Sequence, residues 1–114
     1  MASLTTYLLV SGVERPSDVE SHPAVEARAL EVRDTISDDP VPRITLVDER
    51  PLEEAEPLDE TARTLSEAFP DATVLLSTVE ERFDHVERVE TVLYRDGKNA
   101  GKIEHGYVFN IGRG

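Results

Sequence analysis

The chain has 114 residues, a length typical of one domain, and no cysteine, which excludes disulfides and thiolate metal sites. Asp and Glu number 24 against 12 Lys and Arg, so the formal net charge is −12. Such an excess of carboxylates argues against a general surface for nucleic acids or anionic membranes.

The first half of the chain predicts two strands separated by a helix. The continuous apolar run Tyr7-Leu8-Leu9-Val10 predicts a buried strand over residues 5–13. A proline in the first turn and an apolar stripe at helical spacing predict a helix over residues 23–36. Residues 43–48 predict a second strand, and the glutamate-rich residues 49–57 predict a solvated loop. The stripe of the helix consists of Val25, Ala29, Val32 and Ile36.

The second half of the chain predicts another helix and then a β-rich end. Apolar residues at helical spacing between Pro57 and Pro70 predict a helix, and residues 72–77 predict a third strand. Residues 79–88 fit a short helix, because Thr78 and Glu81 form a capping box, while a long strand from residue 82 is the open alternative. Residues 89–95 predict a strand in either case.

The chain is expected to end in a β-hairpin. Asp96-Gly97 is a turn signal, and apolar residues alternate on both sides of it. A loop over residues 96–100 brings both apolar sets onto one inward face, although Asp-Gly favours a two-residue turn. This register pairs Leu93 with Ile103, Thr91 with His105 and Val89 with Tyr107.

The order of these elements predicts an α/β (α+β) fold. Helices between the first strands indicate a parallel part with crossover connections, and the final hairpin adds antiparallel strands. We therefore expect one globular domain over residues 1–114, built as a mixed β-sheet with two or three helices packed on it.

The basic residues are nearly all arginine. Lys98 and Lys102 are the only lysines, and the other ten basic residues are arginines. Together with abundant valine, this composition resembles the proteins of salt-accumulating halophilic archaea. The resemblance implies a salt-rich interior, where a Debye length of about 3 Å at 1 M screens repulsion among carboxylates. No apolar run approaches the ~20 residues of a membrane helix, and no segment resembles a signal peptide, so we expect a cytoplasmic protein.

Three residues give a metal-site hypothesis. Glu81 and His85 are four residues apart, so on a helix they would share a face, and His105 would supply a third ligand. The competing interpretation is an exposed hydrogen-bonded pair on a charged helix, with His105 as a core residue bonded to Thr91. No cofactor motif is present, and no serine lies in the sequence context of a nucleophile. A small metal-dependent or acid–base enzyme is therefore the alternative function.

The C-terminal hairpin is a basic element in an acidic chain. Arg95, Lys98 and Lys102 lie in it, and Tyr107 follows closely, which makes these residues candidates for binding. The lysines suit protection of a sheet edge, or docking on the carboxylates of another copy or of a protein partner. Nucleic-acid binding through this hairpin, with Tyr94 and Tyr107 to stack on bases, is a further alternative function. It is disfavoured because molar salt weakens phosphate contacts steeply. The sequence thus favours a non-catalytic binding or assembly module.

Net charge generates a testable prediction about salt. We predict that the melting temperature rises between dilute buffer and molar KCl, because unscreened carboxylates repel one another on so small a body. Thermal melts followed by circular dichroism across a salt series measure this. A melting temperature that stays constant or falls would contradict the salt-adapted interpretation.

Overall fold

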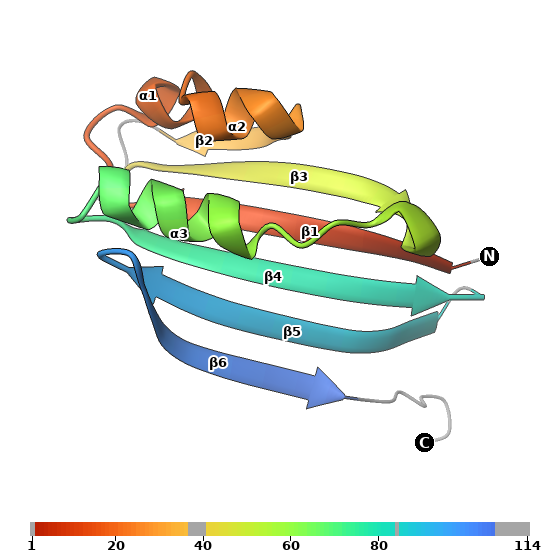
Figure 1. Cartoon of the computed structure of the whole chain (residues 1–114). Helices are drawn as coiled ribbons and strands as arrows, with labels where there is room; N and C mark the ends of the chain where they lie inside the picture. The colour runs from red at the N-terminus through yellow and green to blue at the C-terminus, as the bar shows by residue number, and fades with distance from the viewer. Residues whose placement is uncertain (1, 37–40, 84, 107–114) are drawn as a thin grey trace.

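The computed structural model describes the backbone of residues 2–36, 41–83 and 85–106, and their side chains except at residues 36 and 103–106. Its centre is one six-stranded sheet in the order β2-β3-β1-β4-β5-β6, with short helices between strands (Figure 1). Along the chain the elements are β1 (Ala2–Ser11), α1 (Pro16–Glu20), α2 (Pro23–Arg28), β2 (Glu31–Ile36), β3 (Arg43–Pro51), the 3-10 helix η1 (Leu52–Glu54), α3 (Asp59–Ala68), β4 (Thr73–Arg82), β5 (His85–Arg95) and β6 (Lys98–Gly106).

All neighbouring strands of this sheet pair in the antiparallel sense. Strands β1 and β2 run in the same direction, but β3 lies between them and pairs with both. In the same way β1 lies between β3 and β4, which α3 connects. The first four strands thus follow the β-α-β-β-α-β pattern of ferredoxin-like sheets, and the β5–β6 hairpin extends it. The expected parallel part is wrong, because each crossover skips one strand.

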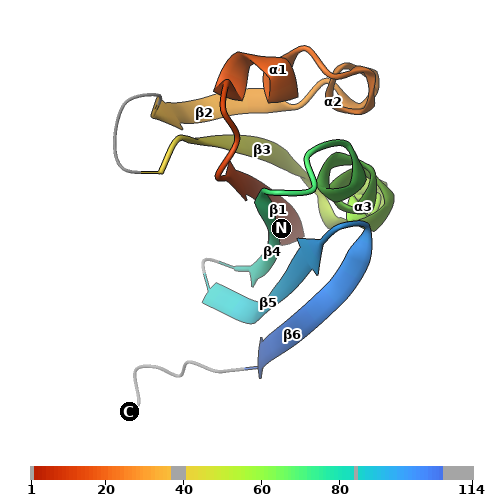
Figure 2. The same ribbon diagram turned by 90° about the vertical axis from the view of Figure 1, so that its left-hand side faces the viewer.

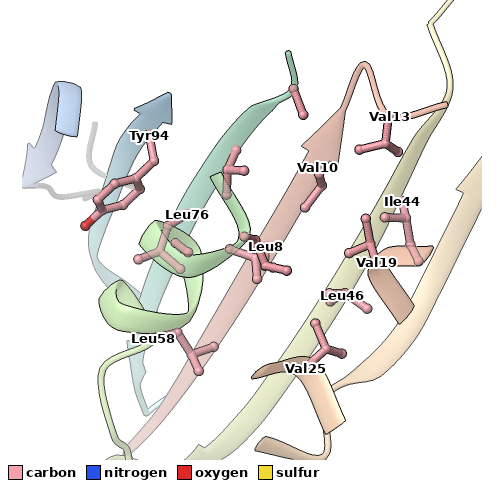
Figure 3. Packing of buried hydrophobic residues seen from close by; sticks show 14 of the residues in the cluster. Leu8, Val10, Val13, Val19, Val25, Ile44, Leu46, Leu58, Leu76 and Tyr94 are labelled. Atoms are coloured by element: carbon pink, nitrogen blue, oxygen red, sulfur yellow. The ribbon is translucent and has the colours of Figure 1, made fainter. Parts of the chain in front are cut away.

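The hydrophobic core joins residues of the three helices to one face of the sheet (Figure 3). On β1 the buried residues Leu8 and Val10 alternate with half-buried ones, as the two-residue period of a strand requires. On α3 the predicted stripe supplies Leu58, Ala62 and Leu65. The cluster consists of Leu8, Val10, Val13, Val19, Val25, Ile44, Leu46, Leu58, Ala62, Leu65, Ala72, Val74, Leu76, Val92 and Tyr94.

The strands expected near residues 5–13, 43–48, 72–77 and 89–95 and the helix after Pro57 are confirmed. The helix expected over residues 23–36 is only half right, because α2 ends at Arg28. Ala29 adopts a left-handed conformation (φ 52°, ψ 45°), which ends the helix, and residues 31–36 pair with β3 instead. The loop expected over 49–57 begins late, since β3 continues to Pro51 before η1.

The short helix expected over residues 79–88 is wrong, and the open alternative of a long strand from residue 82 is closer, because β5 spans His85–Arg95. Strands β4 and β5 are 10 and 11 residues long and pair from Val74–Tyr94 down to Arg82–His85. Pairing with β1 extends along the whole of β4, so the backbone hydrogen bonds of two neighbours outweigh the capping signal of Thr78 and Glu81.

The final hairpin closes more tightly than expected. Arg95 pairs with Lys98, so Asp96 and Gly97 form a two-residue turn with positive φ at both positions (52° and 78°). A bulge at residue 100 then shifts the register, which pairs Thr91 with Ile103 and Val89 with His105. The expected partners were therefore wrong by two residues, although a shift of two leaves each residue on the same face.

Gly97 provides a test of how this turn is held. A Cβ there would lie 2.5 Å from Glu67 Cγ on α3, whereas one at Gly101 would meet no atom within 4 Å. We expect Gly97→Ala to lower the free energy of unfolding by about 1–2 kcal/mol, since it also forces an L-residue to positive φ. Gly101→Ala is the matched control and should change it by less than about 0.5 kcal/mol. Urea unfolding measures both; equal effects would show that the turn does not press on α3.

Candidate docking face

Alternate residues of the sheet point away from the helices and form a second face, which we call the open face. Figure 2 shows α3 on one side of the sheet, and no other described element lies over the opposite side. Strand β1 illustrates the arrangement: Leu8 and Val10 enter the core, while Tyr7 and Leu9 belong to the open face and are half-buried.

The centre of the open face carries no charge. Its residues come from the four strands β3, β1, β4 and β5, which the ladder places side by side. All of them are apolar or carry a hydroxyl, and the hydroxyls of Ser77 and Thr91 bond each other at 3.0 Å. We call this set, in which Thr5 and Val47 are buried and the others half-buried, the central patch: Thr5, Tyr7, Leu9, Thr45, Val47, Leu75, Ser77, Val79, Val89, Thr91 and Leu93.

Charged residues stand at the two ends of the open face, and their signs differ between the ends. At one end Arg43 of β3, Arg95 of β5 and Lys98 of β6 form the basic end. At the other end Glu49 of β3 and Glu81 of β4 form the acidic end. Among the described residues, none of these five side chains forms a salt bridge. The edge strand β2 adds the exposed Glu31 and Asp34 beside the central patch.

The structure separates the basic residues that the sequence grouped together. Arg95 and Lys98 are exposed at the basic end of the open face, whereas Lys102 pairs with Val92 and so projects towards the helix-bearing face. There the Lys102 ammonium lies 3.2 Å from a carboxylate oxygen of Glu90. Tyr107 lies outside the described residues. Arg95 and Lys98 therefore belong to the candidate face, and Lys102 does not.

The three metal candidates lie around the β4–β5 turn and the end of β6. Glu81 pairs with Val86 and lies on the open face, while His85 pairs with Arg82 and projects to the other face. His105 occupies the β6 position opposite Val89, and its side chain lies outside the described residues. Without a helix, Glu81 and His85 do not share a face. Among the described residues, no group of three His, Asp or Glu side chains is placed to hold a metal ion.

Two of the surface hollows on the described part of the chain are lined by residues that form no acid–base pair suited to catalysis. One of about 280 Å³ is lined by Leu4, Thr78, Glu80, Arg88 and Glu90. Its charges are matched within it or nearby: Arg82 lies 3.0 Å from Glu80, and Arg88 lies 3.4 Å from Glu90. Another of about 510 Å³, near Gly12 and the end of α3, has only Glu14 and Asp71 as ionisable residues.

Helix α3 fixes the hairpin that carries the basic end. The Tyr94 hydroxyl donates to Asp59 at 2.9 Å, and the Gly97 amide donates to the buried Ser66 hydroxyl at 2.8 Å. The sequence indicated neither contact, because both join residues more than 30 positions apart. Tyr94 is 2% exposed, so it is not the stacking surface for bases that an aromatic residue in a basic hairpin suggests. These two contacts hold Arg95 and Lys98 in place on a rigid turn.

No family model, curated protein or solved structure matches this chain. Within the described residues, no helix is long and apolar enough to cross a membrane.

The contact between Tyr94 and α3 makes stability depend on pH. Burial and the Asp59 carboxylate raise the pKa of Tyr94 to about 12 from its ordinary value of 10.0. The neutral phenol thus stabilises the fold below pH 10, and this contribution is lost as pH rises through 12. We expect the wild type to lose more stability than Tyr94→Phe over that range, because phenylalanine cannot ionise. Urea unfolding of both proteins at several pH values measures the difference. Parallel pH profiles would contradict a neutral, bonded Tyr94.

Proposed function

We propose that the chain is a non-catalytic binding module that docks another protein surface on its open face. The observation that carries the proposal is the uncharged central patch on a chain in which 32% of residues are charged. Antiparallel sheets with one solvated face ordinarily alternate apolar and polar residues. Strands β1 and β4 instead carry apolar residues at consecutive positions, as strands covered on both faces do.

The consecutive apolar positions are visible on two neighbouring strands. On β1, Leu8 is buried against the helices and Leu9 faces outward; on β4, Leu76 and Leu75 do the same. Burial of apolar area contributes about 25 cal/mol per Å², so covering these outward residues would stabilise a complex substantially. A partner surface that is itself apolar at its centre matches this patch.

The other functions considered have weaker support. An enzyme built on Glu81, His85 and His105 loses its structural premise, because residues 79–82 and 85–88 are strands. A nucleic-acid surface would still have the cations Arg95 and Lys98. It would lack Tyr94 as a ring for stacking on bases, because Tyr94 is buried. Docking through the open face requires neither the metal-ligand set nor an exposed Tyr94. We retain the salt-rich cytoplasm as the proposed setting, since molar salt also strengthens the burial of apolar surface.

Thiol reactivity tests whether the open face is covered in the cell. The chain has no cysteine, so Ser77→Cys places a single thiol in the central patch, and Ser21→Cys places one on the exposed end of α1 as a control. We expect maleimide to label Cys at position 77 at least about tenfold more slowly in intact cells than in the dilute purified protein, because a bound surface excludes the reagent. The thiol at position 21 should show no such difference.

The labelling experiment can also contradict the docking proposal. If both thiols show the same ratio of rates between cells and purified protein diluted until sedimentation shows it to be monomeric, the open face is bare and the docking function is rejected. Ser77→Cys is close to isosteric, and its melting temperature reports whether loss of the bond to Thr91 has disturbed the fold.

A further inference from the structure

We infer that the occupant of the open face is a second copy of this chain, packed face to face about a two-fold axis that reverses the strand direction. The inference rests on the proposed docking function and names the partner. It follows from the distribution of charge on the open face and from the area that the face offers.

The charges at the two ends of the face are complementary to each other. An axis in the plane of the interface and perpendicular to the strands lays the basic end of one copy over the acidic end of the other. Arg43 and Glu49 lie on the same strand, six residues apart, so this rotation brings each towards its counterpart on the partner's β3. Arg95, on β5, approaches the end of β4 that holds Glu81. Each contact occurs twice, because a two-fold axis brings the same surface patch of both copies together.

The alternative rotations fail on charge. An axis parallel to the strands places basic end over basic end and acidic end over acidic end, so like charges meet at both sites. An unrelated acidic protein would match Arg43, Arg95 and Lys98 but would repel Glu49 and Glu81. Among these arrangements, the reversed second copy satisfies both ends.

The area of the face is sufficient for a dimer. The strands from β3 to β6 contain 9 to 11 residues each. At strand spacings near 4.8 Å they present a footprint of roughly 600–700 Å², close to the ~800 Å² per partner of a standard interface. Twisted sheets packed face to face diverge towards their corners, which leaves the exposed Glu31 and Asp34 of β2 in solvent.

Charge reversal at each end provides the test. One variant carries Arg43→Glu and Arg95→Glu, and the other carries Glu49→Arg and Glu81→Arg. Each alone should dimerise about 100-fold or more weakly than wild type, because like charges then meet at both sites. Mixed together, the two variants should form a heterodimer, since an acidic face then lies against a basic one. Sedimentation velocity in molar KCl measures the three samples.

A control and a truncation make the result specific. Arg15→Glu with Lys102→Glu makes the same change of charge away from the open face and should leave dimerisation within about threefold of wild type. A chain that ends at Gly106 tests whether the eight residues after β6 act as the occupant instead. A monomeric wild type whose truncated form dimerises would overturn the inference in favour of that segment.

Other results of the sedimentation and labelling experiments distinguish failure of the dimer from failure of the docking function. Variants that both stay dimeric, or that fail to associate when mixed, overturn the reversed face-to-face arrangement. A wild type that is monomeric at high concentration overturns the second copy as occupant. If position 77 is nevertheless protected in cells, the docking function stands and the partner is another protein; if it is not protected, both proposals fail.

Discussion

Apolar residues at consecutive positions of β1 and β4 are the constraint on which this structure depends. A strand turns successive side chains to opposite faces, so Leu8 and Leu9, or Leu76 and Leu75, demand cover on both sides of the sheet. The chain supplies three short helices, and their buried residues join one face only. The split crossovers keep β1 and β4 in the middle of the sheet, where each strand has neighbours on both sides. The open face is thus a consequence of having more apolar strand surface than helix to cover it.

Helix α3 is the element that ties the fold to the candidate face. It packs Leu65 into the core and bonds the hairpin through Asp59 and Ser66. The tight Asp96-Gly97 turn places Arg95 and Lys98 directly opposite each other, so both project to the same side of the sheet. A looser loop would leave these cations on flexible chain. The tight turn, bonded to α3, fixes where these cations stand relative to the acidic end.

Local sequence patterns predicted the elements whose apolar residues fit only one kind of structure. The helix after Pro57 has a clear helical period, the strand around Tyr7 is a continuous apolar run, and both are confirmed. Residues 29–36 and 79–88 failed because their stripes fit a helix as well as a strand, and only pairing with β3 and β4 decides between them. The candidate face was harder to predict from the sequence than these elements. Arg43, Glu49 and Glu81 join Arg95 only through the sheet order and register, which no local pattern contains. The basic hairpin was visible in the sequence, but the sequence did not indicate that Lys102 lies on the opposite face of the hairpin from Arg95, beside Glu90.

In the proposed dimer, salt would act differently on the total charge and on the charge pairs at the ends of the face. Two bodies of charge −12 repel at long range, and at molar salt a Debye length of about 3 Å removes most of that repulsion. Pairs in direct contact at a partly dry interface are screened much less, while burial of the central patch becomes more favourable as salt is excluded from apolar surface. Molar salt, which we predict to stabilise the fold, would thus also let two copies meet, with the end charges setting their direction. In dilute buffer the repulsion between the two acidic chains is unscreened, so it opposes association before the two faces touch.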